Sequence, residues 1–254
     1  MGFASWQAFY ESDTQSVYAV VALPAAFLGY LALRRSSAGP GLSPDHAAFV
    51  RRYCIAFAFL TILDPLATGP LIRALGGPGT KAELVVSCFF VLLGDFRIFW
   101  LLFRLCGPRI GGAAALEAAG WTLVVPALAL ALRAALGLAF PKLPENTIWL
   151  VYELCFAALA VALRVWLLPH RMTASSPALR RFAQAVASYG AVYYALWALS
   201  DALILGFGFD AGWALRVVPN QLYYAWYVPL VWFGFFPASW AMQSSGLVRR
   251  PASP

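Results

Sequence analysis

Long uninterrupted apolar stretches constrain the fold of this chain more than any other feature of its sequence. A helix that crosses a bilayer needs about 20 predominantly apolar residues. Seven segments reach that length, with approximate limits 15–33, 53–73, 84–104, 112–138, 147–168, 183–208 and 213–240. Their apolar residues are continuous rather than alternating with polar ones, which disfavours membrane β-strands. The sequence therefore predicts an all-α, polytopic membrane bundle of about seven transmembrane helices.

Composition excludes the main alternatives to a membrane protein. Charged residues make up 11% of the 254 residues, whereas soluble domains usually contain about 25%. Intrinsic disorder is excluded because 16% of the residues are aromatic and disordered segments are poor in such side chains. The longest connection lies between residues 33 and 53. We therefore expect residues 1–254 to form a single transmembrane domain with no soluble domain.

The distribution of Lys and Arg predicts the orientation of the bundle, because these residues favour cytoplasmic loops. With seven crossings, twelve of the 18 Lys and Arg residues fall on one side and five on the other, while Arg97 lies within a crossing. We expect the N-terminus outside and the C-terminus in the cytoplasm of a cell membrane. The net charge of +7 then reflects the Lys and Arg residues of the predicted cytoplasmic loops, and it does not indicate a nucleic-acid partner.

Ionisable residues inside the predicted crossings are the main candidates for a functional site. Each costs about 2.5–3.5 kcal/mol at the centre of a membrane helix, so it must face protein, water or another charge. Five such residues occur: Asp64, Asp95, Arg97, Glu153 and Asp201. The seventh segment adds three polar residues at a similar outer depth: Arg216, Asn220 and Gln221. This pattern favours a polar cavity that opens to the outside, with acids at graded depth on a path for protons or cations.

Helical spacing indicates which of these side chains share a face. Asp95 and Arg97 are separated by about 200° around a helix and cannot pair directly. We expect Arg97 to find a carboxylate on another helix, to extend to the membrane surface or to meet a lipid phosphate. Two stripes combine aromatic and polar residues: Tyr193, Trp197 and Asp201 in the sixth segment, and Arg216, Asn220 and Tyr224 in the seventh. Aromatic rings beside a carboxylate can bind an organic cation.

Each candidate also has a structural interpretation. The Tyr193–Asp201 stripe could pack around one satisfied carboxylate, and Asp95 with Arg97 could belong to an interhelical network. Asp64 precedes Pro65 and could mark a helix kink, while Glu153 could be shallow and hydrated. Small residues at four-residue spacing in the fourth segment allow close helix packing, within the chain or between two copies: Gly111, Ala115 and Ala119.

Enzymatic chemistry lacks the side chains that most intramembrane enzymes require. The two histidines, His46 and His170, fall in predicted cytoplasmic loops, which argues against zinc, haem and Ser–His chemistry within the membrane. We expect no catalytic residue, metal or cofactor. The seven-span outline, with an acid in the middle of helix three, resembles that of microbial rhodopsins. The resemblance would imply a retinal-binding lysine in helix seven, but Lys81 and Lys142 lie in outer connections, so a retinal protein is excluded.

The sequence thus favours an integral membrane transporter or channel for a proton, a cation or a small cationic solute. Two alternatives remain open: a ligand-sensing seven-helix receptor or scaffold, and an intramembrane lipid-modifying enzyme. The expected partners are the lipid bilayer, the cationic ligand or proton, and a second copy of the chain packed against the fourth segment. Transport predicts flux through the cavity, whereas a receptor predicts binding of the ligand without flux.

Overall fold

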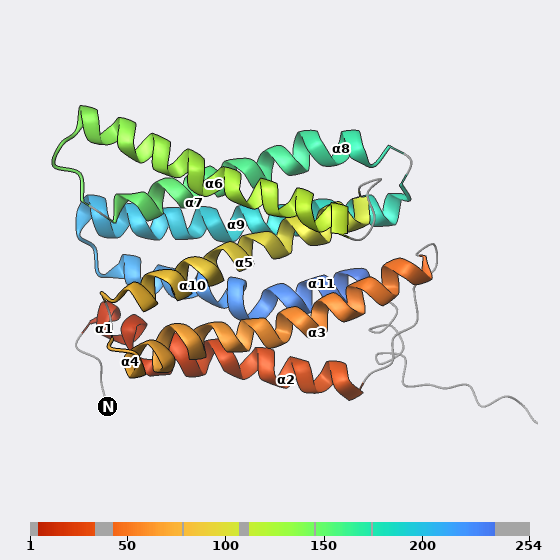
Figure 1. The fold of residues 1–254 in the computed structure, drawn as a ribbon, viewed down its shortest axis with the longest axis horizontal. Helices are drawn as coiled ribbons and strands as arrows, with labels where there is room; N and C mark the ends of the chain where they lie inside the picture. Colours follow the sequence, from red (N-terminus) through yellow and green to blue (C-terminus); the bar gives the residue numbers. More distant parts are fainter. Residues whose placement is uncertain are drawn as a thin grey trace, which may run out of the picture.

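The computed structural model describes residues 5–33, 43–77, 79–106, 112–144, 146–173 and 175–236, which are almost entirely helical (Figure 1). Within these ranges, six helices are long and apolar enough to cross a membrane: Thr14–Leu33, Pro44–Ala74, Lys81–Cys106, Gly112–Ala139, Thr147–Arg171 and Pro177–Phe207. This confirms the prediction of an all-helical protein with several helices that could cross a membrane.

Several of these helices contain a π-helical turn, written η, between two α-helical parts. In chain order the elements are α1 (Trp6–Glu11), η1 (Thr14–Tyr18), α2 (Ala19–Leu33), α3 (Pro44–Leu66), η2 (Ala67–Leu71), α4 (Ile72–Ala74), α5 (Lys81–Cys106), α6 (Gly112–Ala139), α7 (Thr147–Ala162), η3 (Leu163–Leu167), α8 (Leu168–Arg171), α9 (Pro177–Phe207), α10 (Ala211–Gln221), η4 (Leu222–Trp226) and α11 (Tyr227–Phe235). The helical segment Ala211–Phe235 corresponds to the predicted seventh span, and its first half carries most of that segment's polar residues.

The helix ends follow local sequence chemistry. Ser43 and Ser176 cap α3 and α9, where their side chains accept hydrogen bonds from backbone N–H groups of the first turn. Pro44 and Pro177 occupy the first helical position, where a missing N–H has no helical partner to lose. Gly208 ends α9 with a left-handed backbone, φ 66°, which glycine adopts without steric cost. It separates α9 from α10, the boundary that the apolar pattern defines least well.

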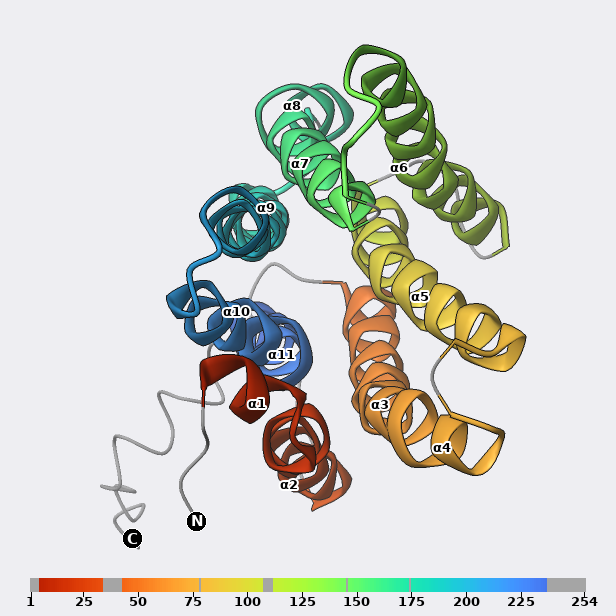
Figure 2. The same cartoon turned by 90° about the vertical axis from the view of Figure 1, so that its left-hand side faces the viewer.

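The long helices form a ring in chain order, seen end-on in Figure 2. Packing contacts join α2 to α3, α7 to α9, α9 to α10, and the η4 turn back to α2. Helix α6 packs against α5 and α7 on the outside of this ring, and α5 also contacts α9 across it. The interior is therefore enclosed by α3, α5, α7, α9 and the α10–α11 segment.

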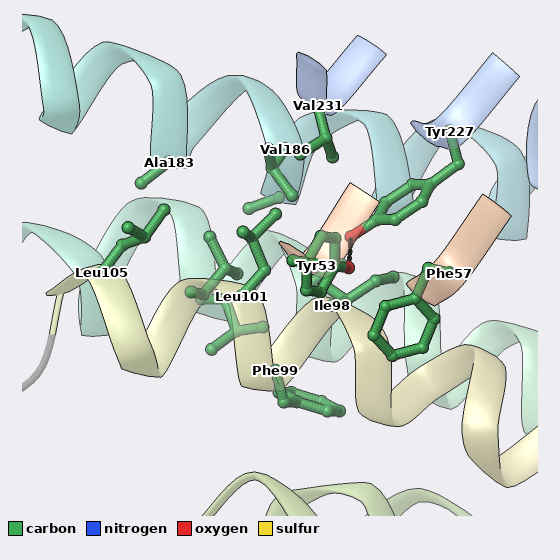
Figure 3. Close-up of a cluster of buried hydrophobic side chains, with 14 of the residues drawn as sticks. Tyr53, Phe57, Ile98, Phe99, Leu101, Leu105, Ala183, Val186, Tyr227 and Val231 are labelled. Carbon is green, nitrogen blue, oxygen red and sulfur yellow. Dashed lines mark hydrogen bonds between the residues drawn. The ribbon is translucent and has the colours of Figure 1, made fainter. Parts of the chain in front are cut away.

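Buried apolar side chains cluster in the half of the bundle away from α1, and Figure 3 shows part of this cluster. Leu101 and Leu105 of α5 pack there with Ala183 and Val186 of α9, and all four are buried. Nearer the middle, the Tyr53 hydroxyl lies 3.0 Å from the Tyr227 hydroxyl. A polar site must therefore lie in the other half, which we call the α1 end.

Candidate functional site

A cavity of about 330 Å³ occupies the α1 end of the bundle. This volume lies at the lower limit of small-molecule sites, which are about 300–1,000 Å³. We call it the acidic cavity, and its wall consists of Tyr10, Asp64, Thr68, Ser87, Phe90, Val91, Trp149, Tyr152, Glu153, Tyr194, Trp197, Arg216, Asn220, Tyr223 and Tyr224. Five long helical segments and α1 contribute to it. The predicted residues Asp64, Glu153 and Arg216 thus meet at one cavity.

Arg216 joins the acidic cavity to Asp201. Its Nη1 donates to the Asp201 carboxylate, which is 3% exposed. The pair links α9 to α10, and Gly212 allows this close packing, since a Cβ there would lie 2.7 Å from Ile204 Cγ1. Asp201 is therefore neutralised by a neighbouring guanidinium and does not itself reach the cavity wall.

Glu153 carries the least satisfied carboxylate of the wall. The residue is 5% exposed, and its Oε2 has no hydrogen-bond partner among the described residues. It interacts electrostatically with Arg216, whose ion pair is already made with Asp201. Because buried charges are normally paired or hydrogen-bonded, an unpartnered carboxylate oxygen at a cavity wall is a binding group for a cation or a proton. The structure does not support the shallow, hydrated interpretation of this residue.

Asp64 faces the acidic cavity from the opposite side of the ring. It is buried, and it forms no ion pair within the described ranges of the chain. Helix α3 continues through Pro65 into the π-turn η2, where the Thr68 hydroxyl donates to the Asp64 backbone carbonyl at 2.9 Å. Asp64 also borders a second void of about 10 Å³ that extends to Arg97.

Asp95 lies behind the cavity wall rather than on it. Its side chain is fully buried, and its two oxygens accept hydrogen bonds from the hydroxyls of Tyr152 and Tyr194. Both tyrosines line the acidic cavity, so their side chains separate the carboxylate from it. Asp95 thus forms an interhelical network that joins α5, α7 and α9, which matches its structural interpretation.

Arg97 forms no ion pair within the described ranges, although its charge interacts with that of Asp64 on α3. Its burial argues against the expectations that it reaches the membrane surface or a lipid phosphate. The residue is 2% exposed, and its Cζ lies 4.1 Å from the ring centroids of both Tyr223 and Tyr227. Its Nη2 donates to the Tyr223 carbonyl at 2.8 Å. That carbonyl belongs to the π-turn η4, and the neighbouring Leu222 carbonyl likewise accepts the Tyr189 hydroxyl. A π-turn rearranges the helical ladder, and its carbonyls here accept side-chain donors.

Gly94 makes room for this arrangement. A Cβ at residue 94 would overlap the Tyr223 hydroxyl. Tyr223 can therefore place its hydroxyl beside α5 and its ring face over Arg97 only because position 94 has no side chain. The same ring also lines the acidic cavity, so Gly94 determines the shape of the cavity floor.

The remaining predicted residues divide between the cavity and the surrounding core. Trp197, Tyr224 and Asn220 line the acidic cavity, whereas Tyr193 and Gln221 are not part of its wall. Tyr193 is buried among rings, with its centroid 4.7 Å from that of Tyr194. Gln221 follows Asn220 and is turned by about 100° around the helix. Both corrections reflect helix rotation, which the sequence defines less well than depth.

The small-residue face of α6 is displaced by one position from the predicted one. Ala114 and Ala118 are fully buried within the chain, whereas Ala115 and Ala119 are half-buried. Gly111 lies outside the described residues. The intramolecular contact therefore uses Ala114 and Ala118, and a contact between two copies through Ala115 and Ala119 stays a prediction.

The short helix α1 contributes to the wall of the cavity at one end of the bundle, which no sequence signal indicated. The Asp210 carboxylate accepts from the backbone N–H groups of Trp6 at 2.8 Å and Gln7 at 3.1 Å. Tyr10 packs on Trp213, with ring centroids 5.4 Å apart, and lines the acidic cavity. Burial raises the pKa of Tyr10 above its ordinary value, although nearby Arg216 opposes this shift.

Comparisons with protein-family models, with curated proteins and with solved structures found no match to this chain. Within the described ranges, no three His, Cys, Asp or Glu side chains are grouped closely enough to hold a metal ion. Function is therefore inferred from the chemistry of the cavity, which offers carboxylates and aromatic rings in a buried setting.

Proposed function

We propose that this protein is a carrier that moves a small cationic solute or a proton across a cell membrane through the acidic cavity. The observation that supports this most is the unpartnered, buried Oε2 of Glu153 on the cavity wall. Asp64 adds a second carboxylate without an ion pair in the described part of the chain. Charge placed inside a membrane bundle is costly, so these carboxylates gain most from a positive ligand that enters.

The closed end of the cavity also fits a carrier. A second void of about 10 Å³, bordered by both Asp64 and Arg97, adjoins the cavity wall at Asp64. Below it, Tyr53 and Tyr227 meet across the bundle and apolar side chains fill the interior (Figure 3). A carrier exposes its site to one side at a time. In this form the buried guanidinium of Arg97 opposes leakage of cations past the floor.

We further propose that the segment Ala211–Phe235 makes a seventh crossing, with the N-terminus outside. At 1.5 Å per residue this segment is roughly 37 Å long, enough to span a hydrocarbon core of about 30 Å. It lies beside the six apolar helices (Figure 1), and seven crossings separate the Lys and Arg residues into groups of twelve and five. Protease protection of terminal epitope tags in sealed vesicles tests this topology: both termini on one side would contradict it.

A ligand-sensing receptor is the second candidate. A closed ring of helices around a cavity that is blocked at one end is also the arrangement that a receptor needs to detect a ligand. The two functions differ in flux: a receptor binds the cation and retains it on one side, whereas a carrier releases it on the other.

Uptake of radiolabelled ethylamine into proteoliposomes that contain the purified full chain tests the proposal. We expect saturable uptake that Glu153→Gln and Asp64→Asn each abolish. Glu11→Gln is the matched control, because this exposed carboxylate of α1 does not line the cavity, and it should transport normally. Wild-type uptake rates in both cavity variants would overturn the site. Binding without uptake would favour the receptor.

A further inference from the structure

We infer that the acidic cavity is built for a ligand with two positive charges, namely a linear diamine or polyamine. This inference rests on the proposed function and narrows its substrate class. It follows from the charges on the wall, from their positions and from the aromatic rings of the wall.

The carboxylates of the cavity wall form no ion pair with the basic side chain of the wall in the described part of the chain. These charged side chains are Asp64, Glu153 and Arg216, and the charge of Arg216 is already matched by Asp201 behind the wall. Two carboxylates are left without an ion pair in the described part of the chain. Because uncompensated charge is costly in a low-dielectric interior, the most complementary ligand supplies two positive charges rather than one.

Glu153 identifies one of the two contact points. Glu153 is only 5% exposed, and its Oε2 has no hydrogen-bond partner among the described residues although the residue borders the cavity. An ammonium group carries three N–H donors and no acceptor, so it complements a bare carboxylate oxygen. The amide of Asn220, also on the wall, can supply a further acceptor at this end.

Asp64 identifies the second contact point, on a different side of the cavity. It belongs to α3, whereas Glu153 belongs to α7, and α5 lies between these helices in the ring (Figure 2). The two carboxylates therefore approach the cavity from separate helices. A ligand with a charge at each end satisfies both, whereas a compact monoamine satisfies one.

Much of the remaining cavity wall is aromatic. Trp197 and Tyr223 lie with ring centroids 5.2 Å apart, and Phe90 is buried beside the cavity. Rings of this kind pack against methylene groups and attract nearby ammonium groups. A divalent metal ion would use oxygen ligands instead, and two carboxylates on separate helices in a largely aromatic wall do not supply its coordination shell. The observations thus favour an organic dication.

Binding of matched amines to the full chain in lipid nanodiscs tests this inference. The probes are putrescine and butylamine, which differ by one terminal ammonium group, and Mg²⁺ and Ca²⁺ as inorganic dications; tryptophan fluorescence reports binding, since Trp197 and Trp149 line the site. We expect putrescine to bind about tenfold tighter than butylamine or more, because measured couplings between close charge pairs at interfaces reach that factor and beyond. Neither metal ion should compete with putrescine.

The variants separate the two contact points. Asp64→Asn and Glu153→Gln should each reduce putrescine affinity to that of butylamine, while Glu11→Gln leaves the difference intact. Equal wild-type affinities for the two amines, with both still dependent on Glu153, would overturn the two-charge inference and leave a monocation site. Competition by Mg²⁺ or Ca²⁺ would also overturn it. Failure of both amines to bind would refute this inference together with the organic-cation form of the proposed function. The comparison of wild-type affinities does not depend on any variant being folded.

Discussion

Removing Asp201 should shift its partner, Arg216, to Glu153, and a double-mutant cycle measures this transfer. Arg216 pairs with Asp201 and interacts electrostatically with Glu153. Truncating one member of a buried ion pair costs about 3–5 kcal/mol when the other charge is left uncompensated. Here Glu153 remains to compensate the guanidinium. We therefore expect Asp201→Asn to lower the free energy of unfolding by only about 1–2 kcal/mol.

The other two corners of the cycle follow from the same contacts. Glu153→Gln removes a carboxylate that has an unpartnered oxygen, so the free energy of unfolding should change by about 1 kcal/mol or less. The double variant leaves Arg216 without either acid and should lose about 3–5 kcal/mol. The two substitutions are thus expected to couple by about 2 kcal/mol. Asp201→Asn should also weaken cation binding, because Arg216 then occupies Glu153.

Unfolding of the purified protein by SDS in mixed micelles, followed by tryptophan fluorescence, supplies these energies. Asp13→Asn is the control, because it breaks the exposed ion pair with Arg73 and should cost less than about 1 kcal/mol. If the effects of Asp201→Asn and Glu153→Gln add within about 0.5 kcal/mol, Arg216 does not transfer between the two acids and the reasoning fails.

Three further changes test the surroundings of the acidic cavity. Gly94→Ala should lower the free energy of unfolding by about 1–3 kcal/mol, since the added methyl group displaces the Tyr223 hydroxyl; an unchanged thermal midpoint would contradict this packing. Asp210→Ala removes the acceptor for two backbone N–H groups of α1 and should destabilise that helix by about 0.5–2 kcal/mol, seen as faster amide hydrogen exchange confined to α1. Burial raises the pKa of Tyr10, so docking of α1 should be intact below the ordinary tyrosine value of about 10 and weaken as pH rises above it. Limited proteolysis of α1 measures this change, and a Tyr10→Phe variant with the same pH profile would exclude Tyr10 as its cause.

The helices could be predicted because continuous apolar runs of this length leave few other structures for the backbone in a membrane. The first residues of the helices could be predicted less accurately. Helix α3 begins at Pro44 rather than near 53, and α9 begins at Pro177 rather than near 183. In both cases the first turns are polar and extend beyond the apolar run. The capping signals Ser43 and Ser176, each followed by proline, mark the true starts.

Depth within the bundle could be predicted for the candidate site, whereas rotation about each helix could not. Asp64 and Glu153 reach one cavity, but Asp95 is covered by Tyr152 and Tyr194. Tyr194, which lines the cavity, adjoins Tyr193, which the pattern singled out, so an error of one residue, about 100°, decides which of these two side chains faces the cavity. The π-turns add to the uncertainty because each changes the register of the helix that follows it.

The position of Arg97 explains why the Asp64 carboxylate on the cavity wall is not consumed in an ion pair with this arginine. Had Arg97 paired with Asp64, the two charges would cancel and the wall would hold a single free carboxylate. Instead, two tyrosine rings and the Tyr223 carbonyl surround the guanidinium, and this carbonyl belongs to the π-turn of a helix that a regular pattern would treat as continuous. Gly94 completes the arrangement by admitting Tyr223. The guanidinium is thus stabilised without an ion pair, so Asp64 has no salt-bridge partner in the described part of the chain and meets Arg97 only through a longer-range electrostatic interaction.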